Sequence, residues 1–235
     1  MMIKAVFFDL YGTLAGFNPS RYEIQNAACD PLDIKVTQEG IAAGYALADS
    51  YMAQQNAINP LRQRDRDGTT QFFAEYEQLV LKGAGVDVTR EQAWEIWLRV
   101  QRVPSQLTLF DDVLPAMALL KSNGLILAII SNMNRDGGEL LTNIGLTSYI
   151  DFAITSAEVG AEKPHPPIFQ AALNNAKVLP EEAMHVGDQI LSDIEGAMGM
   201  GINPVLLDRD GNHSKVEGFP RIESLMELTG LLSGY

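Results

Sequence analysis

The amino-acid sequence predicts an α/β fold, a doubly wound parallel sheet with an inserted all-helical domain. Short, continuously apolar runs alternate with helical segments in the second half of the chain, and such runs are typical of strands covered on both faces of a parallel sheet. One similar run lies near the start of the chain. Residues 17–104 separate the two regions and show helical periodicity. We therefore expect a Rossmann-like core formed by residues 1–16 and 105–235, and an inserted all-helical domain at 17–104.

Composition narrows the functional classes. The chain has 235 residues, of which 46% are hydrophobic, enough to bury a core. Thirty Asp and Glu against 17 Lys and Arg give a net charge of −13, which argues against nucleic acid as a partner. No apolar run reaches the roughly 18 residues that span a bilayer, no secretory signal is recognisable, and Cys29 is the single cysteine. We expect a cytoplasmic protein with no membrane partner; oligomeric state has no signature in the sequence.

The first predicted strand is Ile3–Phe8, which ends at a polar turn. Apolar side chains then recur at helical spacing in three groups. These are Ile41, Tyr45, Ala48 and Met52; Phe72, Tyr76, Leu79 and Val80; and Trp94, Trp97 and Leu98. Helix breaks are expected at Asn59-Pro60, Asp67-Gly68 and Lys82–Gly85. The aromatic stripes predict the core of a helical bundle.

Helices and strands alternate from Asp111 onward. Helices are expected at Leu114–Lys121, at Glu139–Ile144, from Pro166-Pro167 onward and at Ile194–Met200. Strands are expected at Leu125–Ile130, Phe152–Thr155, Met184–Val186 and Pro204–Leu207. This alternation predicts parallel strands joined by crossover helices.

Polar residues stand where these strands end. Asp9, Ser131 and Asp188 each follow or terminate a predicted strand, and Lys163 follows one within a loop. Because ligands of open parallel sheets bind outside the carboxyl ends of the strands, we expect these side chains to converge. An aspartate, a hydroxyl, a lysine and an acidic group together indicate a site that handles a phosphoryl or carboxylate group, and hence a small anionic substrate.

The order of these motifs resembles the haloacid dehalogenase superfamily over nearly the whole chain. The four segments that carry the resemblance are Asp9–Leu14, Ser131-Asn132, Ser156–Gly160 with Lys163-Pro164 and Ile168-Phe169, and Gly187-Asp188 with Asp193. The insert after the first strand is similar to the helical C1 cap of one branch of that superfamily. The resemblance implies a hydrolase that acts through a covalent aspartyl intermediate.

The resemblance also implies catalytic roles. Asp9 would be the nucleophile. Lys163 would keep Asp9 ionised and neutralise charge on the substrate. Ser131, Asn132 and the backbone amides after Ser131 would bind oxygens of the transferring group. Tyr11 stands where the general acid/base of related phosphatases lies.

A magnesium site is implied at the same place. Asp9, Asp188 and the main-chain carbonyl of Tyr11 would coordinate Mg²⁺, and Asp193 would bind through water or orient the ligands. Three acidic groups crowded together repel one another unless a cation offsets their charge. The three histidines, His165, His185 and His213, show no metal-ligand spacing, and we assign them no role.

Tyr11 and the acidic motif favour different reactions. Related phosphatases usually carry aspartate at the position of Tyr11, whereas the 2-haloacid dehalogenases carry tyrosine; a departing halide needs no proton, but an alkoxide does. The Gly187-Asp188 pair and Asp193 instead favour metal-dependent chemistry, since those dehalogenases do without Mg²⁺. We expect Mg²⁺-dependent, phosphatase-type hydrolysis of a small phosphorylated metabolite, with good leaving groups preferred. A metal-independent 2-haloacid dehalogenase and a phosphate-binding protein with little turnover are the alternatives.

Overall fold

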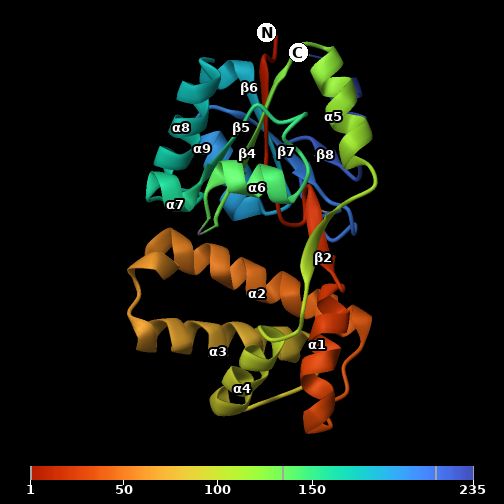
Figure 1. Cartoon of the computed structure of the whole chain (residues 1–235), viewed down its shortest axis with the longest axis vertical. Helices are drawn as coiled ribbons and strands as arrows, with labels where there is room; N and C mark the ends of the chain where they lie inside the picture. The colour runs from red at the N-terminus through yellow and green to blue at the C-terminus, as the bar shows by residue number, and fades with distance from the viewer. Residues whose placement is uncertain (1, 134, 215, 235) are drawn as a thin grey trace. The chain divides into compact units, whose positions relative to one another are not determined.

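The computed structural model describes residues 2–133, 135–214 and 216–234. The chain divides into two compact units, one formed by Met1–Gly16 with Leu109–Tyr235 and the other by Phe17–Thr108. The first, the α/β unit, contains one six-stranded sheet; the second, the helical unit, contains four α-helices (Figure 1). Among the described residues, no helix combines the length and the apolar character needed to cross a membrane.

The sheet of the α/β unit is entirely parallel, with the strand order β5-β4-β1-β6-β7-β8. Its strands are β1 (Ala5–Phe8), β4 (Ile126–Ser131), β5 (Phe152–Thr155), β6 (Ala183–Gly187), β7 (Asn203–Leu207) and β8 (Arg221–Ile222). The chain builds outward from β1 first through β4 and β5, and then through β6, β7 and β8 on its other side. The order therefore reverses at β1, which makes the carboxyl end of β1 the topological switch point.

Helices cover both faces of this sheet, with α8 and α9 on one side and α5 on the other (Figure 1). They are α5 (Val113–Ser122), α6 (Gly137–Asn143), α7 (Ser156–Val159), α8 (Pro166–Ala176), α9 (Gly196–Gly199) and α10 (Leu228–Leu232). Shorter helical segments are η3 (Pro180–Glu182), the π-helical η4 (Ile190–Glu195) and η5 (Leu225–Glu227). Every residue of β1 is buried. Phe7 packs with Ile130 of β4 and Phe169 of α8 in one cluster, which explains the continuous apolar runs in the sequence.

The helical unit consists of α1 (Arg21–Cys29), η1 (Asp30–Leu32), α2 (Gln38–Ile58), η2 (Leu61–Gln63), α3 (Arg66–Gly83) and α4 (Arg90–Val100). The predicted aromatic stripes form its core, where Tyr45, Phe72 and Tyr76 are buried. The chain passes between the units through β2 (Ala15–Asn18) and β3 (Gln106–Leu109), which pair in a two-stranded sheet.

The predicted α/β class and the alternation of elements are confirmed, with local differences. The break expected at Asp67-Gly68 is wrong: these residues form the first turn of α3, because the side chain of Asp65 accepts a hydrogen bond from the Gly68 amide and caps the helix. The single helix expected at Ile194–Met200 is the end of η4 followed by α9. The short strands β2, β3 and β8 were not expected.

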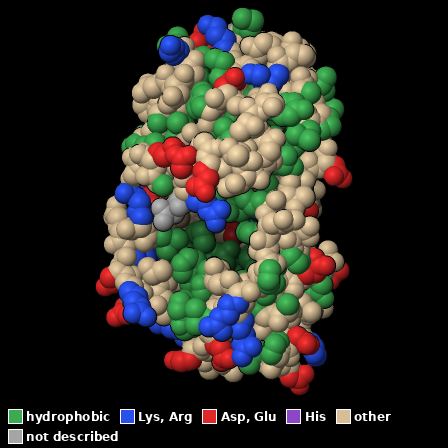
Figure 2. Space-filling model, viewed as in Figure 1, with side chains coloured by type: hydrophobic (Ala, Val, Ile, Leu, Met, Phe, Trp, Pro, Cys, Tyr) green, Lys and Arg blue, Asp and Glu red, His purple; other side chains and the backbone are tan. Residues whose placement is uncertain are grey.

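Acidic and basic side chains of the described residues are interspersed over the face drawn in Figure 2, where they form no continuous basic band.

Candidate active site

The candidate active site lies at the carboxyl ends of β1, β4 and β6, at the switch point of the sheet. Asp9 follows the last residue of β1, Ser131 is the last residue of β4, and Asp188 follows the last residue of β6. β1 pairs directly with both β4 and β6, so these three positions are neighbours in space. The parallel topology thus collects groups that are far apart in the sequence.

The turn after β1 holds Asp9 rigidly. The Asp9 amide donates to the Val186 carbonyl at 2.9 Å, which continues the pairing with β6 for one residue past the strand. Gly12 has a φ of +78°, a conformation that glycine adopts without strain. A Cβ atom at Gly12 would also overlap the Asp188 carboxylate. Glycine at this position therefore lets the turn approach the acidic loop after β6.

Lys163 links two of the predicted acidic residues. Its Nζ lies 2.6 Å from Asp9 Oδ1 and 2.6 Å from Asp193 Oδ1, and the lysine side chain is only 2% exposed. Lys163 belongs to the loop between α7 and α8, and Asp193 belongs to η4. A buried ammonium between two carboxylates has strong electrostatic interactions because water does not screen them.

Asp193 is fixed by three hydrogen bonds. Its Oδ1 atom accepts hydrogen bonds from both Lys163 Nζ and His185 Nε2, the latter at 3.1 Å. Its Oδ2 atom accepts a hydrogen bond of 3.1 Å from the Gln189 amide. The absence of a side chain at Gly187 leaves room for the carboxylate, since a Cβ there would overlap it. Asp193 is thus oriented by the protein itself, as expected of a group that supports the direct ligands of a cation.

His185 is the site residue that sequence reasoning missed. It lies within β6, is fully buried, and its ring packs edge-on against Phe169 at a centroid distance of 5.3 Å. Burial lowers the pKa of His185 below its ordinary value, although the contact with Asp193 opposes this. The signal in the sequence was a histidine in an apolar, buried strand, because a buried polar side chain requires a partner.

Ser131 and Asn132 differ in their contacts. The hydroxyl of Ser131 is buried and makes no hydrogen bond to the described residues, so it is available to a ligand at the end of β4. The Asn132 side chain instead bonds the Lys163 backbone. Asn132 Oδ1 accepts from the Lys163 amide at 2.6 Å, and Asn132 Nδ2 donates to the Lys163 carbonyl at 3.0 Å.

The charges of this cluster shift one another. Burial raises the pKa of Asp9 to about 6, aided by the charge of Asp193 and opposed by Lys163. Burial would also raise the pKa of Asp193, but Lys163 and His185 together hold it well below the usual range. Burial acts to lower the pKa of Lys163, and the two carboxylates outweigh it and raise the pKa above its ordinary value. Lys163 is therefore charged, and the crowding of buried carboxylates is reflected in the raised pKa of Asp9.

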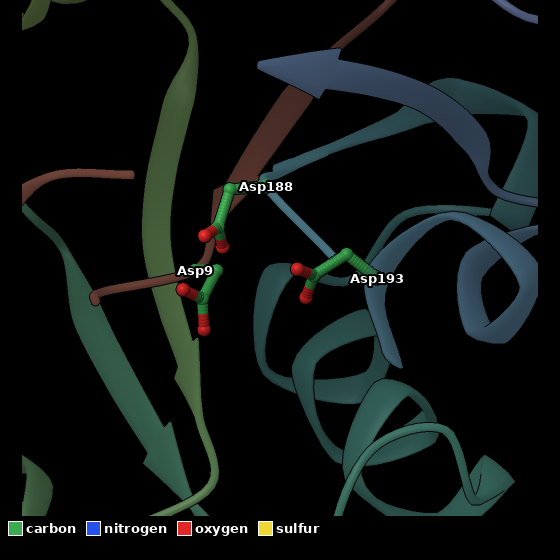
Figure 3. Close-up of side chains that lie close together, drawn as sticks. All are labelled: Asp9, Asp188 and Asp193. Carbon is green, nitrogen blue, oxygen red and sulfur yellow. The ribbon is translucent and has the colours of Figure 1, made fainter. Parts of the chain in front are cut away.

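The cluster fits a divalent cation. Asp9, Asp188 and Asp193 each offer a carboxylate oxygen, and these oxygens lie within 4.8 Å of one another. Figure 3 shows the three carboxylates turned toward a common space. Carboxylate oxygens are the ligands that Mg²⁺ prefers. A cation here would offset the negative charge that Lys163 leaves uncompensated and would lower the raised pKa of Asp9.

The structure therefore places the predicted residues in one region, with different degrees of contact. Lys163 contacts both Asp9 and Asp193 directly, and Asp188 completes the acidic cluster. Among the residues that the structure describes, the Asn132 side chain reaches the cluster through the Lys163 backbone. Half-buried Tyr11 lies in the turn after Asp9, where it pairs with Ala15 in an isolated β-bridge.

Comparison with known proteins places this chain among hydrolases. Residues 3–201 match the family model described as haloacid dehalogenase-like hydrolase. The chain is 28% identical to the ribulose-1,5-bisphosphate 5-phosphatase of Halopiger xanaduensis, over 99% of this chain and 100% of that protein. It is 42% identical to the mouse haloacid dehalogenase-like hydrolase domain-containing protein 3, in a match that spans 37% of this chain and only 35% of that protein.

A solved structure gives the same picture of the fold. The 2-haloacid dehalogenase of Pseudomonas syringae pv. Tomato is 25% identical, covers 99% of both chains, and superposes with a TM-score of 0.60. The similar proteins thus include both a phosphatase and a dehalogenase, so the choice between the two reactions depends on the residues of the site.

Proposed function

Because this chain belongs to the haloacid dehalogenase-like hydrolases, we propose that it hydrolyses small phosphorylated metabolites in a Mg²⁺-dependent reaction, through an aspartyl intermediate on Asp9. The observation that carries the proposal is the cluster of three carboxylates, whose oxygens lie within 4.8 Å of one another, with the buried Lys163 ammonium 2.6 Å from two of them. A doubly charged phosphate group and an acidic cluster both need cationic charge, whereas a singly charged haloacid needs far less.

In the proposed reaction, a carboxylate oxygen of Asp9 attacks phosphorus. The new bond joins Asp9 to phosphorus, and the bond from phosphorus to the leaving oxygen breaks with its electron pair. Lys163 stabilises negative charge on the transferring group, and the buried hydroxyl of Ser131 donates to one of its oxygens. Water then hydrolyses the aspartyl phosphate, which releases inorganic phosphate and restores Asp9.

We assign the cation to Asp9, Asp188 and the main-chain carbonyl of Tyr11, with Asp193 acting from the second layer. Both oxygens of Asp193 already accept hydrogen bonds from the protein, which supports an indirect role for it. Bound Mg²⁺ would supply charge neutralisation for the phosphoryl group. The backbone amide of Asn132 is proposed to bind the same group, since its side chain is directed to Lys163.

Tyr11 defines the expected leaving groups. A phenol with a pKa of about 10 is a poor proton donor compared with a carboxylic acid. Substrates whose leaving group departs without a proton, such as acyl and aryl phosphates, should therefore be favoured. We also propose that the helical unit, Phe17–Thr108, serves as the cap that selects the substrate.

One observation favours a second candidate. Tyr11, together with the likeness to a 2-haloacid dehalogenase, is compatible with attack of Asp9 on a carbon–halogen bond. The acidic cluster favours the phosphatase, because metal-independent chemistry gives no reason to place Asp188 and Asp193 beside Asp9.

A paired assay separates these functions. The purified protein is stripped with EDTA and supplied with p-nitrophenyl phosphate or 2-chloropropionate, with and without Mg²⁺. We expect phosphate release that requires Mg²⁺ and no halide release; Asp9→Asn is the control for background turnover. Metal-independent halide release would establish the dehalogenase. Binding of inorganic phosphate without turnover of either substrate would establish a phosphate-binding protein.

A further inference from the structure

Both polar atoms of the Asn132 side chain are bonded to a single residue. Oδ1 accepts from the Lys163 amide at 2.6 Å and Nδ2 donates to the Lys163 carbonyl at 3.0 Å. The donor and the acceptor of one planar amide thus engage the acceptor and the donor of one residue. Two hydrogen bonds from a rigid planar group fix both the position and the orientation of the Lys163 backbone.

Lys163 needs such support because its backbone lies outside the regular structure. Residues 161–163 belong to neither a helix nor a strand, and Lys163 is 2% exposed. A buried backbone amide without a ladder partner must find another acceptor. The Asn132 side chain supplies it, from a position directly after β4 that is itself tied down by the Met133 amide, which donates to the Ser131 carbonyl at 3.0 Å.

The two hydrogen bonds from the Asn132 side chain to the Lys163 backbone, which we call the Asn132 clamp, join two parts of the site. Asn132 follows Ser131, whose hydroxyl faces no partner among the described residues, and it holds Lys163, whose ammonium lies 2.6 Å from Asp9. A shift of the Lys163 backbone would move the ammonium relative to both carboxylates. We propose that the Asn132 side chain is a positioning residue that holds Lys163 against Asp9, and that it does not itself contact the substrate. The kinetic part of this inference rests on the proposed function.

The chain offers a matched control in Asn203. Its Nδ2 also bonds backbone carbonyls, those of Glu181 at 3.0 Å and Ala183 at 2.9 Å. Asn203 begins β7 and pairs with Met184, near the amino ends of the strands and away from Asp9. Loss of its side chain should cost comparable backbone anchoring without moving any group of the site.

Kinetics with p-nitrophenyl phosphate and Mg²⁺ test the positioning role. We expect Asn132→Ala to lower kcat by about 10- to 100-fold, the range that small misplacements of a catalytic group produce. KM and the inhibition constant of inorganic phosphate should change less than threefold, and Asn203→Ala should keep kcat within twofold of the natural chain. A rise in both KM and the phosphate inhibition constant with kcat unchanged would make Asn132 a substrate-binding side chain and overturn the inference.

Hydrogen–deuterium exchange tests the clamp without any turnover. The Lys163 amide should exchange at least tenfold faster in Asn132→Ala and at the natural rate in Asn203→Ala. Unchanged exchange in Asn132→Ala would overturn the inference even if the enzyme is a phosphatase; faster exchange in a chain that hydrolyses no phosphate would uphold the clamp and reject the proposed function.

A second variant covers failure of the alanine variant to fold. Asn132→Asp keeps an acceptor for the Lys163 amide and loses the donor to its carbonyl. It should show a smaller rise in exchange and a smaller fall in kcat than expected for alanine. Natural exchange together with natural kcat in Asn132→Asp would contradict the inference.

Discussion

Each unit of the molecule buries carboxyl groups, but the side chains that contact these groups differ between the two units. In the α/β unit, Asp9 and Asp193 share the ammonium of Lys163. In the helical unit, fully buried Glu77 accepts a hydrogen bond from the neutral side chain of Gln25, and its second oxygen has no partner among the described residues. Burial raises the pKa of Glu77 to about 7, although the bond from Gln25 opposes this.

The difference separates a site for chemistry from a structural feature. A buried carboxyl without a cation takes up a proton and becomes an ordinary polar group of the core. A buried carboxyl beside an ammonium keeps its charge, at a desolvation cost that only its partners offset. The α/β unit thus maintains charge that a reaction can use, whereas Glu77 of the helical unit takes its hydrogen bond from a neutral amide.

The largest effect should follow from removing the nucleophile. Asp9→Asn should lower kcat on p-nitrophenyl phosphate by about 10⁴-fold or more, as loss of a covalent nucleophile does elsewhere. The unfolding free energy should change by less than about 1 kcal/mol, because an amide oxygen can still accept from Lys163, which also keeps Asp193. Steady-state kinetics and urea unfolding measure the two effects; retained turnover would exclude the covalent mechanism.

Removing the ammonium that Asp9 and Asp193 share should test most directly whether a buried cation stabilises the charged carboxylates of the α/β unit. Lys163→Met leaves Asp9 and Asp193 buried without a compensating charge, and we expect the free energy of unfolding to fall by about 3–5 kcal/mol at pH 8. Turnover should be lost as well. Circular dichroism during urea unfolding measures the stability. A stability equal to that of the natural chain would mean that the ammonium does not hold this cluster together.

Much of the fold was predictable because periodicity reflects burial. The continuous apolar runs became β1, β4 and β6, and strand ends placed Asp9 and Asp188 near one another. The pairing of β2 with β3 was not predictable, since both strands are short and only partly buried. The expected break at Asp67-Gly68 failed because glycine is tolerated in a first turn that a capping aspartate stabilises.

The contacts within the site were less predictable than its location. Sequence order shows that Asn132 and Lys163 approach the same edge of the sheet, but it does not show which atoms meet. The role of Asn132 depends on two hydrogen bonds across 31 positions of the chain, and that of His185 on one hydrogen bond across 8 positions. Such pairings follow from the packed geometry, which no local pattern encodes.

The helical unit should respond to pH through Glu77. Its raised pKa means that the stability from the protonated form is fully present below about pH 4.5 and is lost as pH rises through about 7. Linkage sets this loss at about 3 kcal/mol by pH 8. Glu77→Gln should remove that loss, so the variant should be more stable than the natural chain at pH 8 and similar to it at pH 5.

Tryptophan fluorescence measures the stability of the helical unit in the natural chain and in Glu77→Gln. Trp94 and Trp97 both lie in α4, so their fluorescence during urea unfolding reports the helical unit. The neighbouring Cys29 does not interfere, because burial raises its pKa to about 11. Turnover of Glu77→Gln should stay within twofold of the natural chain. An unchanged difference in stability between pH 5 and pH 8 would show that Glu77 is not the titrating group.

The smallest effect should come from replacing His185, which contacts the buried Asp193 carboxylate as Gln25 contacts Glu77. Asp193 retains Lys163 and the Gln189 amide when the imidazole is removed, so the loss is limited to one hydrogen bond. His185→Phe keeps the aromatic packing and removes the donor, and it should cost about 1.5 kcal/mol of unfolding free energy. His185→Gln restores a neutral donor and should recover part of this. A phenylalanine variant as stable as the natural chain would show that Lys163 and the Gln189 amide orient Asp193 without the imidazole, and that the hydrogen bond from His185 adds nothing to the stability.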